Sequence, residues 1–281
     1  MRVERARPLL GTVVAVRVEG AAGWIDDAIE RAFDAVADVQ RRMSFHDPDS
    51  ELSRLNRAAV QAPQAMSAST WRVLRAALAL ARASDGLFDP AIGGRLVAWQ
   101  QLPAPDSADV DPAATWRDVE LGHDCRVRFR KPLWLDLGGI AKGYAVDRAL
   151  AVLRASGMRG GVVNAGGDLR VFGDALEVVH VREPNDPARS RPLLHLRDGA
   201  VATSAGYFST RDGRTALVDT CGNGSLGHDV SATVCAPRAL WADALTKVVL
   251  ADADAAVPLL RRLHAQAAVL DGAGAPRILP V

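Results

Sequence analysis

The chain has 281 residues, 49% hydrophobic and 24% charged, which is the composition of an ordinary globular protein. Its 34 Lys and Arg side chains are balanced by 33 Asp and Glu, which argues against a general nucleic-acid-binding protein. No apolar run approaches the length of a membrane span, and the N-terminus shows neither a secretory signal nor a lipoprotein cysteine. Three cysteines without metal-site spacing fit a reducing compartment. We therefore expect a cytoplasmic protein without a membrane span.

The first half of the chain predicts one strand and two helices. Alternating residues predict a strand at 12–19, and apolar residues at helical spacing predict helices over 24–43 and around 71–81. Ser67 or Ser69 is the expected cap of the second helix. Polar, Gly-rich or Pro-rich segments predict loops or linkers at 44–57, 83–94 and 103–113.

The second half alternates short strands with helices. A strand at 133–137 leads into a Gly-rich turn and a helix over 140–156, which Gly157 should end. Two further helices are expected at 239–251 and 255–265. Short strands are expected near 161–164, 176–182, 200–204, 215–219, 231–236 and 267–270. This order predicts an α+β fold of interleaved strands and helices in a single domain, residues 1–281.

The stretch "LDLGGIAKGYAVDRAL" at 135–150 places an acid, glycines and a lysine at the start of a helix. Its glycine spacing is not that of a dinucleotide fingerprint, and Lys142 precedes its glycine, unlike the lysine of a P-loop. Asp136 alone fits a simple helix cap. A helix N-terminus is an unfavourable place for a cation, so the charge of Lys142 should meet an anion. Three interpretations stay open at this point: a helix cap, a phosphate cradle, and a metal-and-phosphate site built by both charges.

Three other segments share this character. "FDPAIGG" contains Asp89, "VVNAGGDLRVFG" contains Asn164 and a Gly pair before an acid, and "ATSAGYFS" contains Thr203 and Ser204. Each alone is a turn signal. Together they supply several loops with accessible backbone, which a large polar ligand requires.

These segments resemble those of the FAD:protein FMN transferase (ApbE) family. The similarity rests on "MSFHDPDSELSRLN", "GLFDPAIGGRLVAW", "LDLGGIAKGYAVDRA", "VVNAGGDLRVFG", "VATSAGYF" and "ADAL", in family order over nearly the whole chain. The resemblance implies binding of FAD, cleavage of its pyrophosphate and transfer of FMN to a Ser or Thr hydroxyl of a partner flavoprotein, with release of AMP. It also implies a divalent metal, usually Mg²⁺, on the phosphates, and some relatives hydrolyse FAD instead.

The resemblance also assigns roles to residues. Asp136 is expected to contact FAD, Lys142 to face a phosphate and Phe45 to pack on the adenine. Gly139, through its backbone oxygen, and Asp243, through its carboxylate, are expected at the metal. The other positions expected at the cofactor are Leu10, Leu87, Phe88, Asp89, Asn164, Gly166, Gly167 and Val218.

The chain departs from the family pattern before the last metal segment. The family has a histidine thought to be important for transfer where "ALVDT" places Ala216, whereas Asp219 is retained. His228 lies twelve residues further on and is the candidate to replace that histidine from a loop. Asp219 and His228 are therefore candidate catalytic residues.

A second departure concerns the metal. The family has Asp-x-x-x-Thr on one helix face, but here Lys247 lies four residues after Asp243, and Thr246 comes one position early. An ammonium cannot ligate a hard cation. Either a helical bulge restores Thr246, or Lys247 replaces the metal charge with its own and is a catalytic candidate. FAD binding without turnover and FAD hydrolysis therefore stay as alternatives to transfer.

Overall fold

The computed structural model describes residues 1–20, 23–105, 109–184, 186–206, 214–220, 224–226, 229–271 and 275–280. The chain divides into two compact units, which we call the sheet unit and the helical unit. The sheet unit comprises Met1–Gln40, Lys142–Ala205 and Asp229–Val281, and the helical unit comprises Arg41–Ala141 and Gly206–His228. Because the chain passes repeatedly from one unit to the other, their segments interleave in sequence. The expectation of a single domain stays a prediction.

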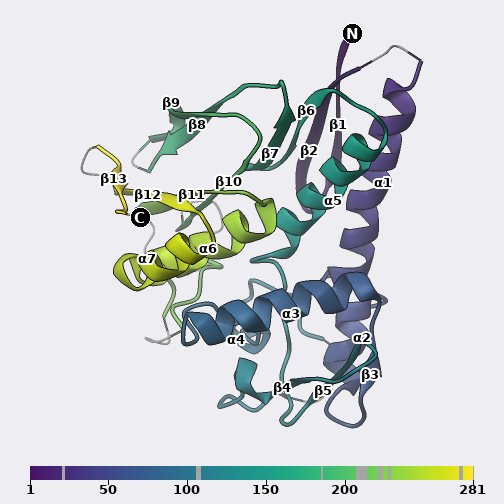
Figure 1. The fold of residues 1–281 in the computed structure, drawn as a ribbon. Helices are drawn as coiled ribbons and strands as arrows, with labels where there is room; N and C mark the ends of the chain where they lie inside the picture. Colours follow the sequence, from purple (N-terminus) through teal and green to yellow (C-terminus); the bar gives the residue numbers. More distant parts are fainter. Residues whose placement is uncertain are drawn as a thin grey trace. The chain divides into compact units, whose positions relative to one another are not determined.

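An eight-stranded antiparallel sheet forms the sheet unit (Figure 1). Its order is β1-β2-β6-β7-β10-β11-β12-β13, so neighbouring strands come from distant parts of the chain. The strands are β1 (Arg2–Leu9), β2 (Thr12–Glu19), β6 (Gly160–Ala165), β7 (Asp168–Gly173), β10 (Ala200–Ala205), β11 (Val230–Ala236), β12 (Gln266–Asp271) and β13 (Arg277–Ile278).

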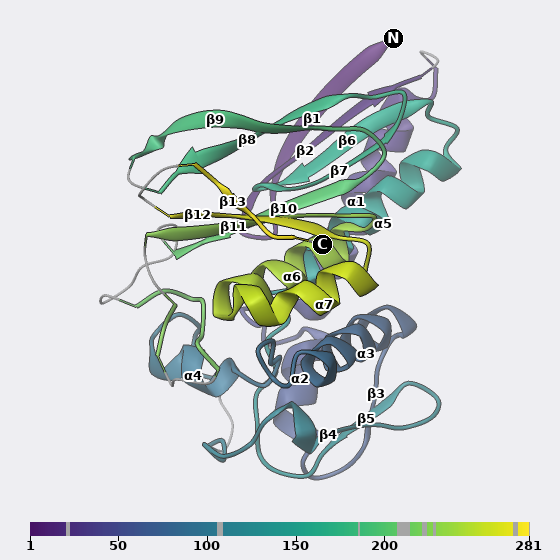
Figure 2. The same ribbon diagram turned by 60° about the vertical axis from the view of Figure 1, so that its left-hand side comes forward.

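Helices and a second, two-stranded sheet cover this sheet. Helix α6 (Ala239–Ala251) packs on β10 and β11, with α7 (Ala253–Arg262) beside it (Figure 2). Helices α1 (Ile25–Met43) and α5 (Ala141–Ala155) lie near β1, β2 and β6. Strands β8 (Glu177–Glu183) and β9 (Asp186–Leu196) pair with each other, and their Val179 and Leu196 join a buried cluster with Val171 and Val201 of the large sheet. Apolar contacts therefore connect the two sheets.

The helical unit is built from short elements. Helices α2 (Glu51–Ala58), α3 (Ala68–Ala83) and α4 (Gly93–Ala98) accompany a three-stranded sheet. Its strands β3 (Gln64–Ala65), β5 (Arg126–Phe129) and β4 (Val119–Leu121) pair in that order, and the 3-10 helix η1 (Trp116–Asp118) precedes β4. No helix of the described residues is both long and apolar enough to cross a membrane.

Strongly periodic segments fold as predicted. The four long helices α1, α3, α5 and α6 are confirmed, Ser67 is the cap of α3 and Gly157 follows α5 with a positive φ of 75°. The expected strands at 12–19, 161–164, 176–182, 200–204, 231–236 and 267–270 are confirmed as β2, β6, β8, β10, β11 and β12.

Three sequence predictions are wrong. Residues 133–137 are buried but form no strand, because their backbone bonds go to loops and to a side chain: Leu135 N–H donates to Asn56 Oδ1, and Asn56 Nδ2 donates to Leu135 O, both at 2.9 Å. The polar segment 44–57 contains α2, which Ser50 caps by accepting the Ser53 N–H. The segment 215–219 contributes only an isolated bridge between Val218 and Ser225.

Candidate functional site

A buried cluster of two acids and two lysines lies in the sheet unit. Lys142, in the first turn of α5, donates from Nζ to Oδ2 of Asp168, the first residue of β7, at 2.6 Å. On α6, Lys247 Nζ contacts Asp243 Oδ1 and donates to the Asp243 carbonyl oxygen at 2.9 Å. Asp243 and Lys247, which are four residues apart, therefore share a helix face and form an ion pair.

Close packing of α5 against α6 positions this cluster. Gly143 N–H donates to Asp243 Oδ2 at 3.0 Å, and a Cβ at Gly143 would overlap the carbonyl oxygen of Ala239. Only glycine permits this approach. Asp147, one turn further along α5, accepts the backbone N–H groups of Ala239 and Leu240 and so caps α6. The sequence G-x-x-x-D thus holds the start of α6 against α5.

The lysines are more exposed than their acidic partners. The side chains of Lys142 and Lys247 are 33% and 20% exposed, whereas those of Asp168 and Asp243 are 2% and 0% exposed. The carboxylates therefore hold the ammonium groups from the protein interior, and part of each lysine remains open to a ligand. Such an arrangement suits a phosphate, which accepts hydrogen bonds from ammonium groups.

Burial and charge oppose each other in this cluster. Burial raises the pKa of Asp168, and the charge of Asp243 raises it further, against the lysines. Burial also raises the pKa of Asp243, but Lys247, Lys142 and Gly143 N–H together hold it below its usual value. The pKa of Lys142, which burial lowers, is raised overall by the charges of Asp168 and Asp243. Lys142 is therefore charged and Asp243 ionised at neutral pH.

The contacts of Asp243 do not fit a divalent cation. Mg²⁺ takes oxygen ligands, but one carboxylate oxygen of Asp243 contacts an ammonium and the other accepts Gly143 N–H. Within the described ranges, no group of three or more His, Cys, Asp or Glu side chains could hold a metal ion. Helix α6 is uninterrupted, so the alternative of a bulge that restores Thr246 is wrong. The metal roles of Gly139 and Asp243 stay predictions.

Hydroxyl groups continue the polar network beside Asp243. Thr246 Oγ1 donates to the Asp243 carbonyl oxygen at 2.6 Å and lies 2.7 Å from Ser204 Oγ at the end of β10. Thr203 Oγ1 and Thr233 Oγ1 are 2.9 Å apart across β10 and β11. Of the two strand-end hydroxyls singled out in the sequence, Ser204 therefore connects α6 to the sheet, and Thr203 connects β10 to β11.

The Gly pair forms the turn between β6 and β7. Gly166 and Gly167 have φ values of 64° and 102°, and Gly167 N–H donates to Asn164 Oδ1 at 2.9 Å. This turn directly precedes Asp168, so it lies beside the cluster in the chain. Leu10 is in the β1–β2 turn with φ 57°, and its N–H donates to Gln40 Oε1 at 2.6 Å.

Two segments of the helical unit that carry predicted cofactor residues meet at Pro90. Asp136 N–H donates to Pro90 O at 2.8 Å, which joins the 87–91 loop to the start of the Gly-rich turn. Asp89 accepts the N–H groups of Ala91 at 2.7 Å and Trp116 at 3.4 Å, and burial raises its pKa. The side chain of Asp136 accepts Gly138 N–H at 3.2 Å.

Other predicted residues of the helical unit lie as follows. Leu87 is half-buried, and Phe88 and Phe45 are buried. Val218 pairs with Ser225, and the carbonyl oxygen of Asp219 accepts a hydrogen bond from Arg95 at 3.4 Å. His228 lies outside the described residues. The cofactor and catalytic roles of all these residues stay predictions.

Neither Asp168 nor Asp147 has a role that the sequence motifs predict. One signal was available for the cluster: the sequence contains only three lysines among 34 basic residues, and two of them, Lys142 and Lys247, lie in it. A lysine in an arginine-rich chain marks a position where a compact ammonium group differs in its effect from a guanidinium. No comparable signal marks Asp147, which the sequence does not distinguish from other acidic residues on helices.

Comparisons with known proteins show which proteins this chain resembles. The model of the ApbE family matches residues 10–270. The FAD:protein FMN transferase of Treponema pallidum is 30% identical over 275 residues, covering 86% of this chain and 76% of the relative, and that of Vibrio cholerae is 28% identical over 268 residues, covering 87% and 79%.

Solved structures show the same fold. The ApbE protein of Thermotoga maritima superposes with a TM-score of 0.86 at 26% identity, over 99% of this chain and 97% of that one. The flavin transferase ApbE of Vibrio cholerae superposes with a TM-score of 0.83 at 21% identity, again over 99% and 97%. The predicted α+β class is confirmed, and the chain belongs to the ApbE family.

Proposed function

We propose that this protein is an FAD:protein FMN transferase that moves FMN from FAD to a Ser or Thr hydroxyl of a partner flavoprotein and releases AMP. Family membership and the names of the relatives support the reaction class. The observation that carries the proposal is the cluster of Lys142, Asp168, Asp243 and Lys247, which presents two ammonium groups held from behind by buried carboxylates.

The proposed step needs charge neutralisation more than covalent help from the protein. The acceptor hydroxyl oxygen forms a bond to the phosphorus of the FMN half, the pyrophosphate P–O bond breaks, and AMP leaves with the bridging oxygen. The hydroxyl proton passes to a base or to solvent. Lys142 and Lys247 would hold the phosphate oxygens and offset the charge that develops on them. The acid–base role of Asp219 or His228 is part of the same proposal.

We also propose that Lys247 takes the place of a metal ligand at this site. The Mg²⁺ that family membership implies would supply two positive charges, whereas the ammonium of Lys247 supplies one. Lys247 already occupies Asp243 Oδ1 and would repel a divalent cation there. We therefore expect FAD to bind without added Mg²⁺.

Product analysis tests the transfer. The full-length protein is incubated with FAD and a panel of acceptor flavoproteins, each beside its Ser→Ala or Thr→Ala variant, and AMP and protein-bound flavin are measured. Equal amounts of AMP and covalently bound FMN, lost in the matched variant, are expected. AMP without bound FMN would identify an FAD pyrophosphatase. FAD binding without AMP would overturn the enzymatic proposal.

A Lys247→Thr variant tests the metal question. Removing the ammonium leaves Asp243 free to bind a cation, so the variant should bind Mg²⁺ by calorimetry and release AMP in a Mg²⁺-dependent manner. A Lys247→Met variant, which lacks both the charge and the hydroxyl, is the control and should lose activity at every Mg²⁺ concentration. Tight Mg²⁺ binding by the wild-type protein would show that Lys247 turns away and that an ordinary metal site forms.

A further inference from the structure

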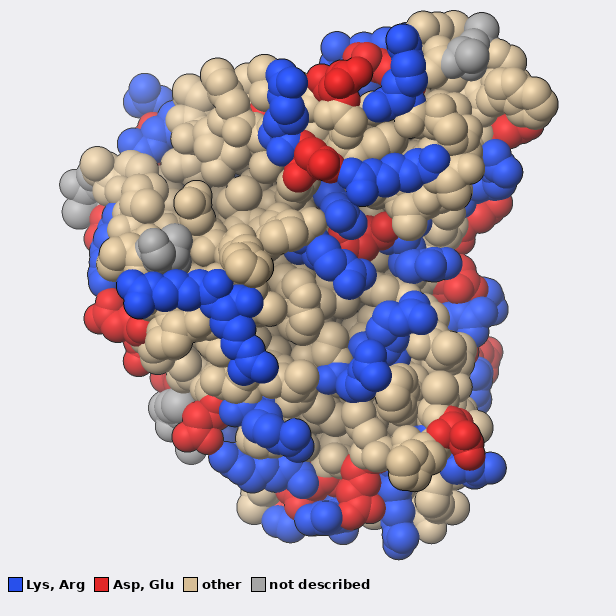
Figure 3. Space-filling view, viewed as in Figure 1, with Lys and Arg blue, Asp and Glu red and all other residues tan. Residues whose placement is uncertain are grey.

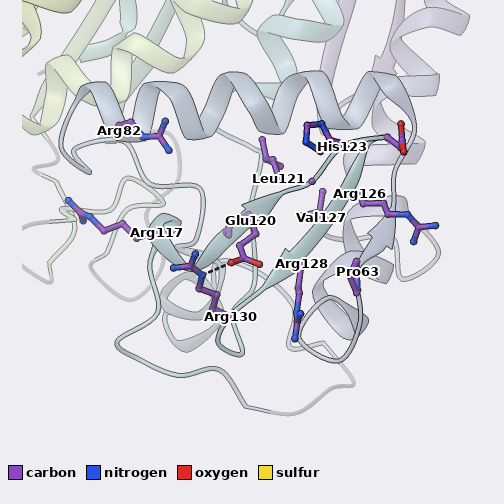
Figure 4. A pocket seen from close by; sticks show the side chains of 13 residues that line it. Pro63, Arg82, Arg117, Glu120, Leu121, His123, Arg126, Val127, Arg128 and Arg130 are labelled. Atoms are coloured by element: carbon purple, nitrogen blue, oxygen red, sulfur yellow. Dashed lines mark hydrogen bonds and ion pairs between the residues drawn. The ribbon is translucent and has the colours of Figure 1, made fainter.

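Arginine side chains line a hollow of about 820 Å³ in the helical unit (Figure 4). They come from three places: Arg82 from the last turn of α3, Arg117 from η1, and Arg126, Arg128 and Arg130 from β5 and the residue after it. Alternation along β5 directs Arg126 and Arg128 outward, because Val127 and Phe129 are buried. Two acidic residues, Glu120 and Asp124, share the lining.

Only part of this positive charge is neutralised within the protein. Arg130 pairs with Glu120 at 2.6 Å, and Arg117 pairs with Asp85 at 2.7 Å. Glu120 lies opposite Arg128 across β4 and β5, but its carboxylate is engaged by Arg130. Among the described residues, the guanidinium groups of Arg82, Arg126 and Arg128 therefore have no acidic partner.

This concentration of charge is local. Lysines and arginines exceed acids by only one over the whole sequence, and the face in Figure 3 shows basic and acidic side chains interspersed. Three unpartnered arginines in one hollow are not required by the fold, because exposed like charges repel one another. A negatively charged ligand in the hollow would offset the repulsion among these three arginines.

The hollow adjoins the loop that carries Asp89. Trp116, next to Arg117, donates its N–H to Asp89 Oδ2 at 3.4 Å, and the Arg117 guanidinium lies over the Trp116 ring at 4.4 Å from its centre. Asp85, the partner of Arg117, belongs to the same segment as Asp89. A molecule bound in the hollow would therefore lie beside a segment that the family resemblance assigns to the flavin nucleotide.

We propose that Arg82, Arg126 and Arg128 form a docking surface for an acidic segment of the acceptor protein. This inference rests on the proposed function, since a transferase must hold a protein substrate as well as FAD. A spread of exposed arginines in an open hollow suits a peptide with several carboxylates better than a compact ligand, whose sites are mostly apolar and enclosed. Arginine is also enriched at protein interfaces, and complementary charge speeds encounter between partners.

Peptide binding tests the surface without FAD or turnover. Fluorescence anisotropy of labelled hexaglutamate with the full-length protein should show binding that weakens as salt is raised. The triple variant Arg82→Glu, Arg126→Glu, Arg128→Glu should lose binding on the order of tenfold or more. The control is Arg2→Glu, Arg159→Glu, Arg262→Glu, which changes the charge equally at exposed positions and should bind as the wild type. The corresponding triple Gln variant guards against misfolding and should also lose binding.

Transfer kinetics give the second measurement. With an acceptor flavoprotein, the triple variants should raise KM for the acceptor about tenfold and leave kcat and FAD affinity unchanged. If the control triple variant raises KM for the acceptor by the same factor, the effect comes from net charge alone, and the proposal is overturned. Inorganic phosphate is added at a concentration equal to that of the carboxylates of hexaglutamate, and displacement of the peptide would indicate a small-anion site. Tighter binding of a single-stranded oligonucleotide than of hexaglutamate would indicate a nucleic-acid surface. Either result overturns the proposed docking surface. If hexaglutamate binds as described but no acceptor is modified, the proposed transfer fails and the acidic docking surface stands.

Discussion

Single charges at the start of α5 and on α6 carry the proposed contacts with phosphate. Asp168 and Asp243 are buried and hold two lysines whose side chains are partly exposed. An unpaired buried carboxylate is costly, so each lysine stabilises its acid in the free protein. When phosphate arrives, each ammonium can keep its carboxylate and still donate outward, because it has three donors.

Replacement of Lys142 should affect the affinity for FAD and the affinity for riboflavin differently. Lys142→Ala removes the charge expected at the pyrophosphate, which riboflavin lacks, so FAD affinity should fall about tenfold or more while riboflavin affinity stays nearly constant. Isothermal titration measures both. Lys131→Ala is the control, since Lys131 is the remaining lysine and pairs with Asp111 at 3.6 Å. Equal weakening of both ligands would show that Lys142 only supports the fold.

The family resemblance places Ala216 at the position of the family's histidine. A positioned acid–base group typically contributes 10²–10⁴-fold, so Ala216→His should raise the rate of AMP release and add a pH dependence near the histidine pKa of about 6.5. Ala216→Gln introduces a side chain similar in size to histidine that does not titrate, so this variant should not raise the rate or add a pH dependence. The measurement is a pH series of AMP release with saturating FAD. An unchanged rate would mean that another group already serves, and His228→Ala is then the next variant.

At the scale of elements, one glutamate joins α2 to the start of α3. Glu51 Oε2 accepts hydrogen bonds from Ser67 Oγ at 2.8 Å and Thr70 Oγ1 at 2.7 Å, and its Oε1 accepts one from Arg42 at 2.6 Å. Burial raises the pKa of Glu51, but the bonds from Thr70, Ser67 and Arg42 outweigh it and leave the pKa below its usual value. The ionised form therefore stabilises the fold.

Glu51→Gln should destabilise the protein by about 1–2 kcal/mol at pH 7. The pKa of Glu51 is lower in the folded protein than in the unfolded chain. Ionised Glu51 therefore contributes its full stabilisation of the fold above the unfolded-state pKa. This stabilisation is lost as the pH falls through the folded-state pKa. The difference between wild type and variant should therefore shrink at acidic pH. Urea denaturation at pH 7 and pH 3 measures it. Glu30→Gln, at an exposed ion pair with Arg7, should change little at either pH.

Asp147 connects α5, β7 and α6. It pairs with Arg170 at 2.6 Å and accepts two N–H groups at the start of α6, the helix that carries Asp243 and Lys247. Asp147→Ala leaves a partly buried arginine and a helix start without this partner, so we expect a loss of about 3–5 kcal/mol in unfolding free energy. The control is Asp252→Ala, which removes only the cap of α7 and should cost about 1 kcal/mol. If both variants lose a similar amount of unfolding free energy in urea denaturation, Asp147 acts only as a helix cap.

Sequence patterns predicted the elements whose burial is periodic and missed those held by other means. Strand β1 was missed because Val3 is its only fully buried residue. The apolar run at 133–137 resembles a strand, but Asn56, from a distant helix, takes the hydrogen bonds of Leu135 that a neighbouring strand would supply. Such partners depend on tertiary structure, which no local pattern contains.

The candidate site also contains some residues that local sequence patterns predict and some contacts that depend on tertiary structure. The lysine and glycines of the 135–150 stretch were predicted from motif chemistry, and the pairing of Asp243 with Lys247 followed from helical spacing. The contact of Lys142 with Asp168 joins residues 26 positions apart and depends on how β7 lies beside α5. Sequence reasoning therefore identified charged residues of the site but not the partner that orients Lys142.

At the scale of the whole molecule, the two units differ in how the chain builds them. The sheet unit needs three separate segments, and its strand β10 pairs with β7 on one side and β11 on the other. Long-range pairing of this kind forms slowly and depends on every segment being present. The helical unit draws most of its residues from one continuous segment, 41–141, which includes its buried Leu52, Leu55 and Phe129.

This difference predicts opposite behaviour of two fragments. The fragment 41–141 should fold alone, with helical circular dichroism and a cooperative thermal transition, because α2, α3 and the β3-β5-β4 sheet lie within it. The fragment 1–205 should aggregate, because it leaves β10 as an edge without β11 and without the cover of α6. Full-length protein is the reference for both. If 41–141 is instead a random coil, the helical unit depends on the rest of the chain, and the expectation of one interlocked domain over 1–281 is the correct description.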